Sequence, residues 1–126
     1  MAGFSRRFDK SYRNAAQQIF NHASGSSAIG KPFMVRSNTC DLLDETGFFV
    51  RYAARNGGIF VDCAIHDIDL TLWYLGDPVP KACWAVGTLR HHPELKERDD
   101  VDNAVGVVQF WGGEIAYYYC SRTQAH

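Results

Sequence analysis

"GGIFVDCAIHDIDLTLWYLGDP", residues 57–78, is the stretch that decides the fold. A glycine pair opens it, a mostly apolar segment follows, and Gly76 with Pro78 closes it, which is a usual stop signal for a helix. The spacing predicts one helix from Ile59 to Leu75. Because this helix is apolar on nearly every side, we expect it to be buried against other elements.

One polar stripe runs along the predicted helix. At about 100° per residue, Asp62, His66 and Asp69 fall within about 60° of one another, and Trp73 continues the stripe. Asp67 points to another side, where we expect a solvated carboxylate or a local ion pair. Since an unpaired buried charge is costly, the stripe must face water, a partner or a cavity.

The stripe has three chemical interpretations. The plainest is an exposed face on which Asp62 and His66 form a pair worth on the order of a few tenths of a kcal/mol. The second is a dyad in a cleft, where the carboxylate fixes the imidazole tautomer and raises its basicity, as a general base requires. The third is a metal site, which is the least favoured because no clear third ligand lies nearby.

The glycine pair allows two interpretations as well. Gly57 and Gly58 can simply form a turn between two helices. Alternatively, two residues without Cβ let a ligand approach the backbone, and free N–H groups at a helix start suit polar or anionic groups.

The rest of the chain predicts helices and strands around this centre. The expected elements are a short opening strand in "AGFSRRF" (2–8), a helix capped by Asp9, a strand at Phe33–Cys40, a short helix at Phe48–Asn56, a strand at Lys81–Leu89, and a hairpin of "NAVGVVQFW" (103–111) and "EIAYYYCSR" (114–122). Helices that precede a run of consecutive strands indicate the α+β class. We therefore predict a single domain over residues 1–126: a largely antiparallel open β-sheet with helices packed on one face.

Composition narrows the function classes. The 126 residues carry 13 basic and 14 acidic side chains, so no strong field is available for nucleic acid or an anionic membrane. No apolar run approaches the roughly 20 residues of a spanning helix. The N-terminus lacks the apolar centre of a signal peptide, which favours a cytoplasmic protein. The four cysteines are scattered, and we expect reduced, mostly buried thiols rather than disulfides or a zinc site.

At this point the stretch at 57–78 resembles the signature of the glucose–fructose oxidoreductase/inositol dehydrogenase (Gfo/Idh/MocA) family. The shared features are a glycine pair, an aspartate four residues before a histidine, another three residues after it, an aromatic residue and a leucine–glycine stop. Three more segments resemble the family's second, C-terminal domain in the same order: "GFSRRFD" at 3–9, "AIGKPFMVRS" at 28–37 and "DNAVGVVQFWGGEIAYYYCSR" at 102–122. Within the family, the chain is most similar to the inositol 2-dehydrogenase group.

The resemblance implies a chemistry. Family members move hydride between NAD or NADP and a secondary hydroxyl of a sugar or cyclitol. Carried over, His66 is the proton-transfer residue, Asp62 pairs with it or with substrate, and Asp69 lies near the same pocket or supports it. Gly57 and Gly58 would border the substrate, so the polar stripe would line a cleft between two domains.

Arginines add further candidates. Arg122 follows the hairpin on the side where the family often places substrate contacts. Arg6 and Arg7 could contact cofactor or substrate, although adjacent arginines at a strand end are more often solvated.

The family's dinucleotide-binding Rossmann domain has no counterpart in the sequence. No G-x-G-x-x-G turn is present, and neither is the family's Glu-Lys-Pro motif. The resemblance thus implies a piece truncated at both ends, which alone binds no cofactor and is inactive. An alternative is a non-catalytic interaction protein that keeps the sheet for dimerisation. "VVQFW" (107–111) and "AYYYC" (116–120) fit such a homo-oligomer interface or, equally, core strands covered by helices.

Overall fold

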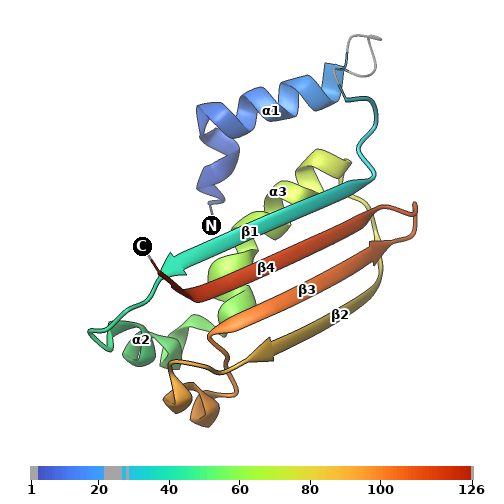
Figure 1. The fold of residues 1–126 in the computed structure, drawn as a ribbon. Helices are drawn as coiled ribbons and strands as arrows, with labels where there is room; N and C mark the ends of the chain where they lie inside the picture. The colour runs from blue at the N-terminus through green and yellow to red at the C-terminus, as the bar shows by residue number, and fades with distance from the viewer. Residues whose placement is uncertain (1–2, 22–26, 28, 126) are drawn as a thin grey trace.

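The computed structural model describes residues 3–21, 27 and 29–125 (Figure 1). Its helical elements are η1 (Ser5–Phe8), α1 (Lys10–Phe20), α2 (Phe48–Asn56), the π-helical η3 (Phe60–Ala64), α3 (Ile65–Leu75) and η4 (Pro93–Arg98), and its strands are β1 (Met34–Leu42), β2 (Pro80–Thr88), β3 (Asn103–Phe110) and β4 (Ile115–Gln124). The predicted α+β class is confirmed.

The four strands form one open sheet in the order β1-β4-β3-β2. Strands β2, β3 and β4 pair antiparallel, whereas β1 runs parallel to β4. The predicted hairpin is confirmed: β3 and β4 are joined through Gly112 and Gly113, and Gly113 has a φ of +92°, which glycine adopts without strain. The sheet is therefore mostly, but not wholly, antiparallel.

One face of the sheet carries the core. Figure 1 shows α3 running behind the strands. Two clusters form there: Ile59, Cys63 and Ala64 pack with Ala104 and Cys120, and Phe110, Ala116 and Tyr118 pack with Ile68, Leu72 and Leu75. Because successive strand residues point to opposite faces, Tyr117 and Tyr119 of β4 lie on the other face. Within the described ranges that face is open, and every residue of β2 is exposed.

The helix predicted at 59–75 is present, with one addition. Its backbone is helical from Ile59 to Leu75, but its first turn, Phe60–Ala64, is a π-helix. Gly57 and Gly76, at φ values of +80° and +77°, mark the end of α2 and the end of α3. A π turn bonds each residue to a partner five positions away, so it rotates less per residue than an α-helix.

The N-terminal prediction is partly wrong. Residues Ser5–Phe8 form a 3₁₀ turn rather than a strand, because Arg6 and Arg7 are drawn to carboxylates on α3. Asp9 does cap α1 as predicted, since its carboxylate accepts the N–H of Ser11 at 2.8 Å.

Two smaller corrections concern β1 and the thiols. Strand β1 runs to Leu42, beyond the predicted end at Cys40. All four cysteines are free thiols, and Cys63 and Cys120 are buried, but Cys40 and Cys83 are exposed, which corrects the expectation of mostly buried thiols. Among the described residues, none of the helices has the length and apolar character needed to cross a membrane.

Candidate functional site

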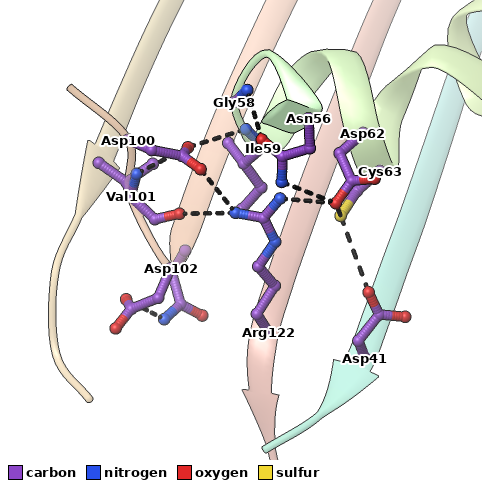
Figure 2. Close-up of polar contacts among 11 residues, drawn as sticks. Asp41, Asn56, Gly58, Ile59, Asp62, Cys63, Asp100, Val101, Asp102 and Arg122 are labelled. Carbon is purple, nitrogen blue, oxygen red and sulfur yellow. Dashed lines mark hydrogen bonds and ion pairs between the residues drawn. The ribbon is translucent and has the colours of Figure 1, made fainter. Parts of the chain in front are cut away.

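The start of the long helix is tied to the end of β4 by one guanidinium (Figure 2). Arg122 is only 2% exposed, and its Nη2 donates to Oδ2 of Asp62 at 2.8 Å. Its Nη1 donates to Oδ2 of Asp100 at 3.0 Å and to the carbonyl of Val101 at 3.2 Å. The guanidinium carbon lies 3.8 Å from the ring centroid of Phe49. Arg122 therefore joins three distant segments of the chain to the helix start.

Two backbone N–H groups at this helix start, those of Gly58 and Ile59, are occupied. Oδ1 of Asp100 accepts the N–H of Ile59 at 2.8 Å, and Oδ1 of Asn56 accepts the N–H of Gly58 at 2.9 Å. A Cβ built on Gly58 would lie 3.5 Å from Oδ1 of Asp100, and one built on Gly57 would lie 3.0 Å from Val61. The ligand interpretation of the glycine pair required free N–H groups, and those of Gly58 and Ile59 are taken. The geometry supports a turn.

Asp62 uses only one of its two carboxylate oxygens. Oδ2 accepts from Arg122 and, at 3.2 Å, from Nδ2 of Asn56. Oδ1 has no hydrogen-bond partner among the described residues, and it is not buried. It is therefore open to solvent, on a side chain that is 24% exposed.

His66 is half-buried, and its two ring nitrogens differ in their exposure. Its Nδ1 is buried without a hydrogen-bond partner, whereas Nε2, which has no partner in the described part of the chain either, is not buried. No hydrogen bond between described residues joins His66 to Asp62. Asp62 lies in the π turn, and its carboxylate is instead held by Arg122.

Further along the helix, two more carboxylates are paired with arginines. Asp67 is buried and bonds to Arg6 and to the hydroxyl of Thr39, so the expectation of a solvated or locally paired Asp67 is wrong. Asp69 accepts from Nε and Nη2 of Arg7, both at 2.8 Å, and these bonds use both of its oxygens. The two arginines, which the sequence left open, are ion-pair partners of the helix.

Burial shapes the electrostatics of the helix start. It raises the pKa of Cys63 to about 11 and that of Cys120 to about 12, so both thiols are protonated at neutral pH. Burial alone would lower the pKa of Arg122, but Cys63, Asp62 and Asp100 outweigh it and raise that pKa. Arg122 is therefore a permanent cation.

The described residues contain no group of three or more histidine, cysteine, aspartate or glutamate side chains that could hold a metal ion.

Sequence reasoning missed three members of this arrangement: Asp100, Asn56 and Phe49. Asn56 carried a local signal, because it directly precedes a glycine pair and such residues often bond the backbone two positions on. Asp100 and Phe49 meet Arg122 only through the tertiary fold, so no local pattern indicates them.

Comparison with known proteins shows which family and which relatives the chain resembles. The family model described as "GFO/IDH/MocA C-terminal domain" matches residues 20–126. The scyllo-inositol 2-dehydrogenase (NAD(+)) of Bacillus subtilis is 32% identical over 124 residues, which is 98% of this chain and 34% of that protein. The myo-inositol 2-dehydrogenase of Thermotoga maritima is 32% identical over 120 residues, which is 95% of this chain and 33% of that protein.

A solved structure agrees. The scyllo-inositol dehydrogenase of Lactobacillus casei, crystallised with NAD(H) and scyllo-inositol, superposes with a TM-score of 0.84 at 32% identity and covers 100% of this chain and 36% of its own. The chain thus spans about a third of the length of these relatives.

Proposed function

We propose that this chain, which belongs to the Gfo/Idh/MocA family through its C-terminal domain, is the substrate-side part of an NAD(P)-dependent oxidoreductase. The reaction would act on a secondary hydroxyl of a cyclitol or sugar, with an inositol as the first candidate. The names of the relatives support this, since they are inositol 2-dehydrogenases. The observation that carries the proposal is the open Nε2 of His66 beside a buried Nδ1.

His66 is the proposed proton-transfer residue. A general base must bring an unpaired nitrogen to the substrate hydroxyl, and Nε2 is unpaired and open. Oδ1 of Asp62 is the proposed acceptor for a second substrate hydroxyl, rather than an orienting partner of the imidazole. Asp62 and His66 are both half-buried residues of a helix whose buried residues Ile59, Cys63 and Ala64 belong to the core cluster.

The other predicted site residues take supporting roles in this proposal. Asp69 spends both carboxylate oxygens on Arg7, so it fixes the N-terminal segment to the helix. Arg122 is buried, and Gly57 and Gly58 form the turn before the helix. We therefore propose that these residues shape the site without touching the substrate.

The start of the long helix offers poor support for a dinucleotide. A pyrophosphate needs free N–H groups at a helix start, but those of Gly58 and Ile59 are occupied, and the carboxylate of Asp100 would repel it. NAD or NADP would be held by a nucleotide-binding domain outside these 126 residues. The isolated chain should therefore show neither NAD binding by calorimetry nor inositol-dependent NAD reduction.

The open face of the sheet supports a second candidate function, association through this domain with or without catalysis. Trp84 on β2 is 60% exposed, and Tyr117 and Tyr119 on β4 lie on the same uncovered face. Exposed aromatic side chains in a contiguous patch are typical of interfaces. We expect a homo-oligomer in sedimentation velocity. A monomer at every accessible concentration would contradict this second function only.

The decisive experiment supplies the missing domain. The chain replaces the matching third of the Bacillus subtilis relative, and scyllo-inositol-dependent NAD reduction is assayed. His66→Ala should lower kcat by roughly 10²–10⁴-fold, the usual contribution of a general acid–base group, and leave the Kd for NAD unchanged. Asp62→Asn should lower it less, because the amide keeps a hydrogen-bonding oxygen.

His91 provides the matched control. It is an exposed histidine in the loop before η4, and its side chain has no role in the site. His91→Ala should leave kcat unchanged in the same chimaera. An active chimaera in which His66→Ala keeps a near-parental kcat would remove His66 from the mechanism.

A further inference from the structure

The ion cluster at the helix start is more than a salt bridge, because one guanidinium serves two carboxylates. The side chains of Arg122 and Asp100 are 2% and 4% exposed, whereas that of Asp62 is 24% exposed. Two members of the cluster are thus fixed in the protein interior and the third reaches the surface.

Asp100 connects this cluster to the backbone. Its Oδ2 binds Arg122, while its Oδ1 accepts the N–H groups of Ile59 and Val101, each at 2.8 Å. The end of β4, the segment before β3 and the first residue of the helix are therefore held as one unit (Figure 2). A shift of Arg122 would move the helix start and the Asp62 carboxylate together.

The consequence for Asp62 is an asymmetric carboxylate. A free aspartate on a helix surface can rotate and offer either oxygen to a ligand. Here Arg122 and Asn56 hold Oδ2, so only Oδ1 faces outward. Fixing a group in one orientation before the substrate arrives is a known source of rate, since the ordering cost is already met.

We infer that Arg122, held by Asp100, is a positioning residue that fixes the Asp62 carboxylate so that Oδ1 alone is offered to the substrate. This inference deepens the proposed function and rests on it. The competing explanation is a purely structural ion cluster. Buried ion pairs are weak evidence for a stabilising role, because well-packed apolar side chains often serve stability as well or better.

The first test uses the 126-residue chain and needs no activity. Arg122→Lys keeps the positive charge but loses the planar fork that reaches two carboxylates at once. We expect the Asp62 carboxyl carbon signal to shift in NMR spectra, and amide exchange at Ile59 to become faster. Arg7→Lys is the matched control, because it alters the Arg7–Asp69 ion pair on the same helix, and it should leave both signals in place.

A second variant keeps the inference testable if Arg122→Lys does not fold. Asp100→Asn keeps an oxygen for the N–H of Ile59 but turns an amide donor toward Arg122, so the guanidinium loses that anchor. The Asp62 signal should shift as in Arg122→Lys. If either folded variant leaves the Asp62 carboxyl signal as in the parent chain, the inference is wrong.

The second test separates positioning from structure by kinetics in the chimaera. Arg122→Lys should lower kcat/KM by roughly 10- to 100-fold, the size expected for a small misplacement of a binding group. It should cost little more in an Asp62→Asn background, because the residue it positions is already altered. Full additivity of the two substitutions would overturn the inference.

The two proposals fail in distinguishable ways. If His66→Ala leaves kcat unchanged while Arg122→Lys still shifts the Asp62 carboxyl signal, the proposed function fails. The orientation of Asp62 by Arg122 then still stands. If His66→Ala abolishes turnover while Arg122→Lys and Asp62→Asn are additive, the function stands and the positioning role is lost.

Discussion

Two arginine–aspartate clusters sit on the same helix and differ mainly in access to water. At the helix start, the Arg122 side chain is 2% exposed and shared by two carboxylates. Five and seven residues along the helix from Asp62, Asp67 and Asp69 pair with Arg6 and Arg7, whose side chains are 25% and 34% exposed. The inner cation depends wholly on the protein for its partners, whereas the outer cations can exchange a lost partner for water.

The comparison indicates that the contribution of an ion pair to stability depends on its burial more than on its hydrogen-bond geometry. Arg7 binds Asp69 with two short hydrogen bonds, and the hydrogen bond to Asp69 raises its pKa. Arg122 makes one bond to each carboxylate, yet its loss would leave the carboxylate of Asp100, whose side chain is 4% exposed, as a buried unpaired charge.

The largest expected effect is therefore the removal of the inner cation. Arg122→Met keeps a long apolar side chain against Phe49 but leaves Asp62 and the buried Asp100 without compensation. Breaking a buried pair typically costs about 3–5 kcal/mol, and we expect the free energy of unfolding to fall by that amount. Urea unfolding followed by circular dichroism measures it. A loss no greater than that of Arg7→Met would contradict the comparison.

Removal of an outer cation should cost less. Arg7→Met leaves Asp69, whose side chain is 8% exposed, without its partner, but the gap left beside Asp69 admits water. We expect a loss of about 1–2 kcal/mol, between the values for exposed pairs and for an unsatisfied buried acceptor. In high salt, the loss in the free energy of unfolding caused by Arg7→Met should become smaller. The loss caused by Arg122→Met should change less, because salt screens exposed charges better.

The contrast also separates what the sequence could predict from what it could not. Glycine and proline punctuation is local, so the ends of the helix at Ile59 and Leu75 and the turn at Gly112–Gly113 were predictable. The π turn was not, because a helical wheel assumes one rotation per residue. That assumption placed Asp62 and His66 on one stripe and allowed them to be partners, whereas no hydrogen bond joins the two among the described residues.

Long-range partners account for the remaining differences. We expected Asp67 to be solvated or paired locally because its partners, Arg6 and Thr39, lie 61 and 28 residues away. Asp62 and Arg122 are 60 residues apart, and nothing local indicates their contact. The parallel pairing of β1 with β4 is equally remote in sequence. The family resemblance supplied the proposed roles of the helix residues, whereas their long-range partners are found only in the fold.

The smallest expected effect concerns a carboxylate with no arginine, one step away from the inner cluster. Asp44 lies just before α2, the helix that carries Phe49 against Arg122, and its Oδ2 accepts the N–H of Phe49 at 2.7 Å. This hydrogen bond, helped by Thr46, lowers the pKa of Asp44 to about 2. A pKa lowered by folding stabilises the protein above the unfolded value of about 4, and that contribution disappears as the pH falls toward 2.

Asp44→Asn tests this contribution, because the amide keeps an acceptor for the Phe49 N–H but cannot titrate. The urea midpoint of the parent chain should fall more steeply than that of Asp44→Asn between about pH 4 and pH 2. At neutral pH the two midpoints should differ less than those of either arginine variant and its parent, because this carboxylate remains in contact with water. Parallel acid profiles would show that this hydrogen bond carries no charge-dependent stability.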